Sequence, residues 1–273
     1  TFIVSEFAKR HVTVSLSGDG GDELFAGYSR YHNKRAEIAW KISRKIPSIS
    51  NLFPLNILGN SETRFSQEVF NKLSRLQALQ ECRDHIDYYE MLGNQWPLSP
   101  VLNYLDKDNS GLDKDLIRSL DDPIFQMSAL DISKYMPDCI LTKVDRAAMA
   151  SSLETRVPML DHRLVEFACQ LPVTHKVHGA IGKIPLRQLL YRYVPEKIVN
   201  RKKAGFSVPV GDWVKGSMRD WSEDLLNERK MKEQGLLDVD IVKRAWKNHL
   251  MGCNGYSHPI WMILMFQAWL ANE

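Results

Sequence analysis

Two patterns of hydrophobic and polar positions occur along the chain. Residues 12–16 form a short apolar run that ends abruptly in the glycine-rich stretch 17–23. A continuous run of this kind is typical of a strand covered on both faces. Beyond residue 23, apolar residues recur at helical spacing in nearly every segment, for example at Phe65, Val69 and Leu73. The pattern predicts a single strand, under-paired and with uncovered apolar surface, followed by a predominantly α-helical chain.

Breaks rich in glycine, proline, asparagine and serine separate the helical segments. They divide the chain into three regions. We expect a terminal piece of an α/β sheet with its turn over residues 1–34, a peripheral helical region over 35–120, and a second helical bundle over 121–273. No internal repeat or low-complexity stretch is present in the sequence.

The turn after the apolar run has the composition of a ligand-binding loop. Glycines fill three of the four positions 18–21, where they allow positive φ and close approach of a ligand to the backbone. Asp19, Asp22 and Glu23 crowd the first turn of the predicted helix. Because Mg²⁺ bridges to nucleotide phosphates through one or two protein acids, this turn indicates the edge of a Mg-nucleotide site. A helix N-terminus with capping acids is the alternative.

Two familiar phosphate-binding motifs are not matched. Glu23 stands where the dinucleotide fingerprint needs its third glycine, and Gly182-Lys183 is followed by Ile184 rather than by serine or threonine. The sequence therefore supports neither a Rossmann NAD site nor a Walker P-loop.

A second loop carries one cation. Lys183 follows Gly182 and precedes a predicted helix, in whose first turn Pro185 is well accommodated. A glycine-flanked loop with one lysine is suited to close over a phosphate group. A surface lysine in a β-turn fits the same residues.

Charged residues also interrupt the apolar pattern in the second half. Lys143, Asp145 and Arg146 lie on a helix that we expect to begin near Pro137. An exposed, salt-bridged helix face is the simpler interpretation of these three, and a contribution to a site is the other.

Two further segments combine charge with a chain break. Glu154 and Arg156 precede Pro158, which forces the chain out of helix, and residues at such an exit can face a cleft. Arg201 and Lys203 belong to a basic turn. The simpler interpretation is a solvated loop, and the alternative is a loop that contacts phosphate or carboxylate.

Composition excludes several classes of protein. Lys+Arg of 36 against Asp+Glu of 33 gives a net charge of +3, too balanced for nucleic acid or an anionic membrane as the main partner. The longest apolar run, residues 260–270, is too short to span a bilayer and predicts a buried helix. The four cysteines form no CxxC pair, which favours reduced core thiols and, with no visible signal peptide, a cytoplasmic protein.

Taken together, the segments resemble the synthetase domain of glutamine-dependent asparagine synthetases. The resemblance spans nearly the whole chain, in order, and rests on these pieces: residues 16–28 (LSGDGGDELFAGY), 143–146 (KVDR), 153–161 (LETRVPMLD), Lys183 with Leu186-Arg187, Pro195 through Phe206, and the helix 261–270. It implies an α/β fold of the adenine nucleotide α-hydrolase (ATP pyrophosphatase) type, of which 1–273 is a C-terminal, mostly helical part. It also implies ATP- and Mg²⁺-dependent conversion of aspartate to asparagine through β-aspartyl-AMP.

The resemblance implies roles for individual residues. Asp22 matches the Mg²⁺ ligand at the ATP site, and Lys183 matches a catalytic, phosphate-facing lysine. Ser17 and Gly18 match positions that line ATP. Asp19 matches a catalytic acid beside the acyl-adenylate, although some family members carry glutamate there. A supporting shell would comprise Glu23, Lys143, Asp145, Arg146, Glu154, Arg156, Arg187, Arg201 and Lys203.

Two parts of the family pattern are missing from the sequence. It contains no Ser-Gly-Gly-x-Asp-Ser turn and no N-terminal cysteine nucleophile. We therefore expect an N-terminal glutaminase domain in a longer protein, and a chain that is inactive by itself. Three other readings are a β-lactam-forming synthetase, a non-catalytic scaffold of a polysaccharide gene cluster, and an RNA-modifying enzyme that the near-neutral charge disfavours. The amide acceptor and self-association stay open.

Overall fold

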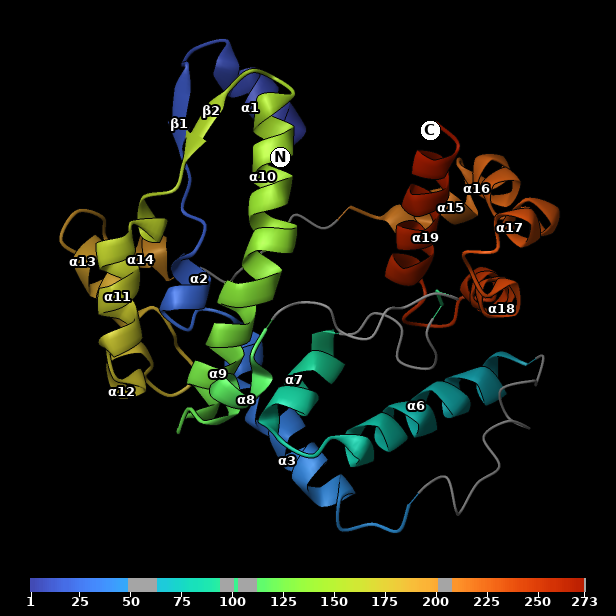
Figure 1. Ribbon diagram of the computed structural model, residues 1–273, viewed down its shortest axis with the longest axis horizontal. Helices are drawn as coiled ribbons and strands as arrows, with labels where there is room; N and C mark the ends of the chain where they lie inside the picture. Colours follow the sequence, from blue (N-terminus) through green and yellow to red (C-terminus); the bar gives the residue numbers. More distant parts are fainter. Residues whose placement is uncertain (49–62, 94–100, 103–111, 201–207, 273) are drawn as a thin grey trace. The chain divides into compact units, whose positions relative to one another are not determined.

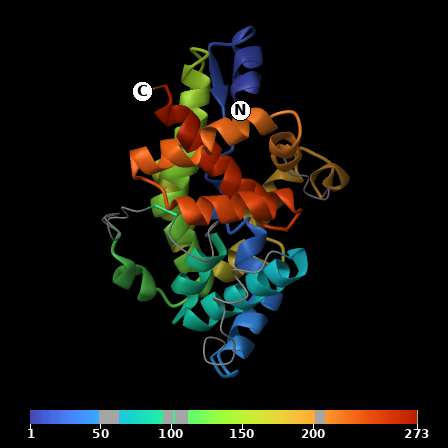
Figure 2. The same ribbon diagram turned by 90° about the vertical axis from the view of Figure 1, so that its right-hand side faces the viewer.

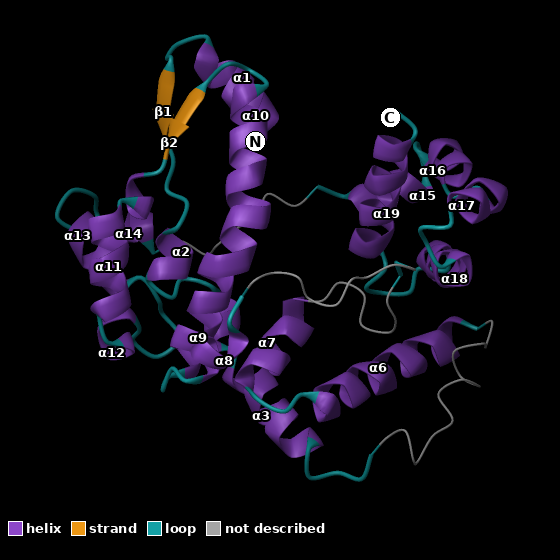
Figure 3. Cartoon of the chain, in the orientation of Figure 1, coloured by secondary structure: helices purple, strands orange, loops and turns teal. Residues whose placement is uncertain are grey.

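The computed structural model describes residues 1–48, 63–93, 101–102, 112–200 and 208–272 (Figure 1). The predicted strand is present but short: β1 (Val14–Leu16) pairs in parallel with β2 (Glu154–Arg156). Among the described residues these two strands form a sheet by themselves, as Figure 3 shows. Val12, Val14 and Leu16 are 46%, 37% and 73% exposed. The expectation of an under-paired strand with uncovered apolar surface is confirmed. The expectation of a single strand was wrong, because Glu154–Arg156 form a second one through pairing with β1.

Helices make up most of the described structure, as the sequence predicts (Figure 3). They are α1 (Phe2–Lys9), α2 (Gly21–Leu24), η1 (Ser29–His32), α3 (Lys34–Ser43), α6 (Arg64–Glu81), α7 (His85–Gly93), α8 (Lys114–Arg118), α9 (Pro123–Leu130), η2 (Asp131–Leu141), α10 (Thr142–Met149), η3 (Pro158–Leu160), α11 (His162–Gln170), α12 (Val173–Lys176), α13 (Ile184–Leu190), α14 (Glu196–Val199), α15 (Val210–Lys215), α16 (Arg219–Leu225), α17 (Glu228–Gln234), α18 (Val239–Leu250) and α19 (Ser257–Leu270). Two of these are 3₁₀-helices, η1 and η3, and η2 is a π-helix.

The chain forms two compact units. Unit 1 comprises residues 1–38 and 108–203, and unit 2 comprises residues 39–107 and 204–273. The sheet, both glycine-rich loops and the helices from α8 to α14 belong to unit 1. The three-region division inferred from the sequence stays a prediction.

The helix expected to begin near Pro137 begins earlier. Pro123 occupies its first turn, and the Asp122 side chain caps it by accepting from the Ile124 N–H at 2.7 Å. The chain then continues without a break through α9, η2 and α10. Pro137 lies inside the π-helical part, where the wider turn accommodates a residue without an N–H. The prediction of the helix start was therefore wrong.

In unit 1, α10 supports the sheet region. α1 and α10 are in contact and lie side by side in Figure 1 and Figure 2. α10 also contacts β2, so the strand pair and α1 share one supporting helix. A small core lies below the sheet, where Leu24 and Phe25 pack with Ala168 of α11. This core fixes α2 at the end of β1.

In unit 2, α19 is the central helix of the hydrophobic core. Ile260, Ile263 and Leu264 of α19 are buried among residues of α15, α17 and α18. The prediction of a buried helix is confirmed for one face, whereas Met262 and Trp269 on the helix are 52% and 55% exposed. None of the described helices combines the length and apolar character needed to cross a lipid bilayer.

The cysteines are only partly core residues. Cys82 and Cys253 are buried, whereas Cys139 and Cys169 are exposed, and all four are free thiols. Burial raises the pKa of Cys82 to about 11, which keeps this thiol protonated and unreactive at neutral pH. The expectation of reduced thiols is confirmed, and that of four core positions was wrong.

One lysine is buried where the sequence gives no sign of it. Lys176, at the end of α12, is 3% exposed, and its Nζ lies 4.6 Å from the ring centroid of Phe125. Burial lowers the pKa of Lys176, because the charged form loses hydration. The cation–π contact offsets part of that cost.

We expect Lys176→Met to stabilise the protein by about 1 kcal/mol at neutral pH, because it keeps the apolar stem and removes the buried charge. The folded-state pKa of Lys176 lies below its unfolded value. The penalty is therefore full below the folded pKa and is lost as pH rises toward the unfolded value of about 10.4. Urea unfolding near pH 7 and near pH 10 measures the gain, which should be larger at the lower pH. Lys134→Met, at an exposed position of η2, is the control and should change stability by less than about 0.5 kcal/mol.

Candidate functional site

The glycine-rich turn follows directly from the sheet. Ser17, the first residue after β1, donates its N–H to the Arg156 carbonyl at 2.8 Å, which continues the pairing with β2. Its hydroxyl donates to the Asp19 carboxylate. Gly20 then takes a φ of +87°, and a Cβ there would lie 2.7 Å from a methyl group of Leu160. Glycine is therefore required at position 20 by both its conformation and its close packing.

The predicted lysine loop lies against this turn. A bridge between His178 and Ile181 closes the loop, and Lys183 follows with a φ of +60°. The Lys183 N–H donates to the Phe25 carbonyl at 2.8 Å, and its Nζ forms an ion pair with Asp22 Oδ2, also at 2.8 Å. The structure thus brings together two predicted site residues that are far apart in the sequence.

Two glycines make this contact possible. A Cβ on Gly182 would lie 1.8 Å from the Ala26 carbonyl oxygen, so the two backbones touch directly. A Cβ on Gly27 would come within 2.2 Å of both the Lys183 side chain and the Asp22 carboxylate. Lys183 therefore reaches Asp22 past two backbone positions that only glycine leaves open. We use the name crevice for Asp22, Lys183 and these two glycines.

The acid next to Asp22, Glu23, is buried inside the unit and does not face Lys183. Glu23 is 1% exposed, and its carboxylate accepts the Tyr28 hydroxyl at 2.5 Å. Burial, followed by the hydrogen bond to Glu23, raises the pKa of Tyr28 above its usual value, so the phenol stays a donor. The Ser128 hydroxyl of α9 donates to the Glu23 carbonyl at 2.5 Å. Glu23 thus supports α2 from inside the unit, whereas Asp22 faces Lys183.

The support extends to the π-helix. Asp131, 3% exposed, forms an ion pair with Arg30 at 2.7 Å and accepts the Tyr31 hydroxyl. The Arg30 guanidinium lies 4.4 Å from the ring centroid of Tyr28 and 4.9 Å from that of Tyr135. Sequence reasoning gave no role to these residues. The only signal is the concentration of tyrosine and arginine just after the glycine-rich turn.

The other predicted residues lie in different surroundings. Arg187 is half-buried on α13 and donates its Nε–H to the Gly182 carbonyl at 3.1 Å, next to the site. Glu154 and Arg156 form an exposed ion pair at 2.6 Å on β2.

Lys143, Asp145 and Arg146 are exposed on α10, and no described hydrogen bond or ion pair links them to Asp22 or Lys183. Gly18 is exposed, with open space where a Cβ would stand. Arg201 and Lys203 lie outside the described residues.

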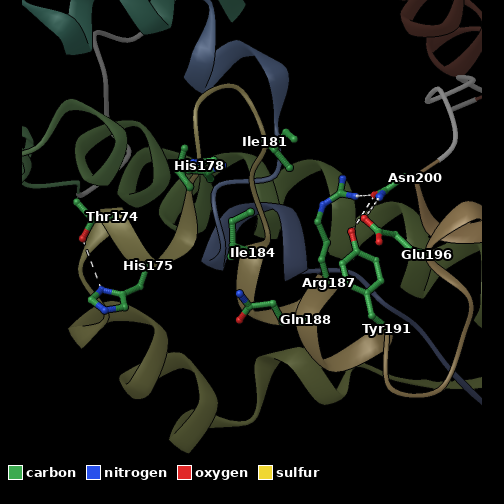
Figure 4. Close-up of a pocket in the computed structure, with 11 residues that line it drawn as sticks. Thr174, His175, His178, Ile181, Ile184, Arg187, Gln188, Tyr191, Glu196 and Asn200 are labelled. Atoms are coloured by element: carbon green, nitrogen blue, oxygen red, sulfur yellow. Dashed lines mark hydrogen bonds between the residues drawn. The ribbon is translucent and has the colours of Figure 1, made fainter.

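One cavity of the described structure lies beside the site rather than in it. It has a volume of about 820 Å³ and is lined by residues of α12, α13 and α14, including Ile184, Arg187 and Asn200 (Figure 4). Asp19, Asp22 and Lys183 are not among its lining residues. The cavity therefore does not include the acid–lysine crevice. The charged side chains of the crevice, rather than this cavity, are the basis for inferring a function.

Metal binding at the crevice would rely on few protein ligands. Within the part of the chain that the structure describes, no three His, Cys, Asp or Glu side chains group around a common point that could hold a metal ion. Asp22 and Asp19 offer hard carboxylate oxygens beside an open backbone, which fits an ion held mainly by waters and phosphate oxygens. The donor set therefore fits Mg²⁺ with a nucleotide better than a closed metal cage.

The chain belongs to the asparagine synthase family, whose model matches residues 1–271. It is 29% identical to asparagine synthetase (glutamine-hydrolyzing) 1 of Bacillus subtilis strain 168, over 98% of this chain and 42% of that protein. A putative asparagine synthetase (glutamine-hydrolyzing) of Mycobacterium bovis is 28% identical over 99% of this chain and 41% of its own length. Amidase chyE of Penicillium rubens is 22% identical over 86% of this chain. The chain thus spans less than half the length of these two synthetases.

We expect Gly182→Ala to detach the lysine loop, because the new Cβ would overlap the Ala26 carbonyl and neither backbone can yield locally. The Lys183 amide, now bonded to Phe25, should then exchange its hydrogen at least tenfold faster. Gly179→Ala in the same loop is the control, because its Cβ would meet nothing within 4 Å and its φ of +62° adds only about 1–2 kcal/mol of strain. Unchanged exchange in Gly182→Ala would show that the contact is not needed for docking.

Proposed function

We propose that this chain carries the synthetase active site of an ATP-dependent asparagine synthetase. The observation that carries the proposal is the ion pair between Lys183 and Asp22, held at 2.8 Å in a glycine-lined crevice at the end of β1. Membership of the asparagine synthase family supports the same reaction. The fold would be of the adenine nucleotide α-hydrolase type, with the β1–β2 pair as part of its sheet.

The first reaction step would be adenylation of aspartate. An oxygen of the aspartate β-carboxylate bonds to the α-phosphorus of ATP, the bond from that phosphorus to the bridging oxygen breaks, and pyrophosphate leaves. Negative charge grows on the departing phosphates, where a preorganised cation is most effective. Lys183 would supply this cation, since its backbone is fixed by Phe25 while its Nζ can turn from Asp22 to a phosphate.

Asp22 would hold Mg²⁺, which neutralises and orients the phosphates when bound. Its carboxylate is already positioned by the close approach of Gly27 and faces the crevice rather than the core. Ser17 and Gly18, which extend from the strand end, would line the nucleotide. Ser17 also holds the Asp19 carboxylate through its hydroxyl.

The second step would be amide formation. Ammonia attacks the acyl carbon, the acyl–phosphate oxygen bond breaks, AMP leaves with the electron pair, and the nitrogen loses a proton. Asp19 is the acid that we assign to accept this proton. The ammonia would come from glutamine, hydrolysed by an N-terminal domain of the same protein. The chain covers 42% of the Bacillus relative, whose name describes it as glutamine-hydrolysing.

In the full-length protein, we expect Lys183→Ala to lower kcat for aspartate-dependent pyrophosphate release by roughly 10²–10³-fold, as for loss of one preorganised donor. KM for aspartate should change much less, because the lysine acts mainly in the transition state. Asp22→Asn should instead raise the Mg²⁺ concentration required for half-maximal rate.

Lys134→Ala, at an exposed position on η2, serves as the control and should leave both constants unchanged. Near-normal pyrophosphate release by Lys183→Ala would remove the lysine from the mechanism. Wild-type protein that releases no pyrophosphate with aspartate, ATP and ammonia would refute the proposed reaction itself.

A further inference from the structure

The lysine loop is held by a side chain that follows Lys183 by one helical turn. Arg187 of α13 donates its backbone N–H to the Lys183 carbonyl at 2.9 Å and its Nε–H to the Gly182 carbonyl at 3.1 Å. The backbone bond is an ordinary helical bond of α13 that any residue would make, so the side-chain bond to Gly182 is the contribution of the arginine. The Gly182 backbone is the part that must lie against Ala26 for Lys183 to reach Asp22.

Arg187 is itself anchored from the other side. Its Nη1 donates to the Asn200 side-chain carbonyl at 2.7 Å, and the Tyr191 hydroxyl donates to the same oxygen at 2.9 Å. The Asn200 amide in turn donates to Glu196 at 2.8 Å. Figure 4 shows Arg187, Tyr191 and Glu196 converging on Asn200. The four side chains join α13 to α14 and form a brace behind the loop.

The loop needs such a restraint because its own residues make few stabilising contacts. Lys183 has a φ of +60°, a conformation that costs a non-glycine residue about 1–2 kcal/mol. Ile181 is 50% exposed, and Gly179 has open space around it, so few apolar contacts hold the tip of the loop. A strained residue persists only where its surroundings over-determine it.

We propose that Arg187 is a positioning residue, which keeps the Lys183 loop docked on α2 through its bond to the Gly182 carbonyl and its anchor on Asn200. Its relevance to catalysis rests on the proposed function, whereas the docking itself does not. Both acceptors of the guanidinium are neutral oxygens. The role therefore depends on the fixed, planar arrangement of the guanidinium N–H donors rather than on their charge. A lysine ammonium cannot reproduce this arrangement.

The test compares four variants of the full-length protein. Arg187→Lys keeps the charge but loses the planar arrangement of donors, and Asn200→Ala keeps Arg187 but removes its anchor. Tyr191→Phe removes one bond to Asn200 and should have a smaller effect. Gln188→Ala is the matched control, because Gln188 is an exposed neighbour on α13 that lines the same cavity.

Hydrogen exchange of the Lys183 amide is the first measurement. We expect about tenfold faster exchange in Arg187→Lys and Asn200→Ala, the loss typical of one hydrogen bond to a charged group. The amide of Ala168 in α11 should keep its wild-type protection. Equal acceleration at both amides would mean general destabilisation, and no acceleration at Lys183 would mean that Arg187 does not hold the loop. Either result overturns the proposal.

The second measurement is aspartate-dependent pyrophosphate release. A displaced Lys183 should lower kcat about tenfold in Arg187→Lys, with KM for aspartate nearly unchanged and Gln188→Ala normal. A fall in kcat without faster exchange at Lys183 would overturn the positioning role. If exchange responds as expected while the wild-type protein releases no pyrophosphate, the positioning role stands and the proposed reaction fails.

Discussion

The candidate site depends on direct contact between two stretches of backbone. The lysine loop and the end of α2 approach until a Cβ on Gly182 would overlap the Ala26 carbonyl, and the Lys183 N–H bonds to the Phe25 carbonyl. The Ala26 carbonyl also contacts the His32 ring at 2.8 Å. Because the carbonyls of Phe25, Ala26 and Gly182 all have hydrogen-bond partners, the loop can lie against α2 without leaving these acceptors unsatisfied. A shift of either stretch would remove the acid–lysine pair together with these bonds.

Adjacent acids on α2 have different environments, because consecutive residues of a helix point about 100° apart. Asp22 and Glu23 are consecutive, so their side chains project in different directions. Asp22 meets Lys183 in the crevice, whereas Glu23 is sequestered with the Tyr28 hydroxyl and cannot reach a ligand. A buried carboxylate is tolerated only with a strong donor, which here is the hydroxyl of Tyr28, whose ring lies against the Arg30 guanidinium. Glu23 thus supports the turn from inside the unit, and Asp22 remains partly exposed beside Lys183.

Patterns in neighbouring residues predicted the glycine-rich turn of the site better than the side chains that support it. Glycines at 18, 20 and 21 and the apolar run before them identified the strand, turn and helix, because those residues act on their own backbone. The separate roles of Asp22 and Lys183 came from the family resemblance, but their ion pair was not predicted, since no periodicity relates positions so distant. The ion pair of Arg30 with Asp131 escaped prediction for the same reason. On α6, Phe65 is 78% exposed while Gln67 is buried and bonded to Asn248, so a polar contact from a distant helix overrode the hydrophobic pattern.

The exposure of the acid–lysine pair suits the exchange of partners that the proposed reaction requires. Both side chains are 27% exposed, which places the pair between a surface ion pair and a buried one. Breaking a fully buried pair costs about 3–5 kcal/mol, because each charge is left without hydration. Solvent-exposed pairs contribute only about 0–1 kcal/mol and exchange readily with other ions. At intermediate exposure, Asp22 and Lys183 can hold one another in place, and water, Mg²⁺ or phosphate oxygens can still replace each partner. The rigidity that catalysis needs would then reside in the backbone contact and the Arg187 brace, while the charged ends stay free to change partners.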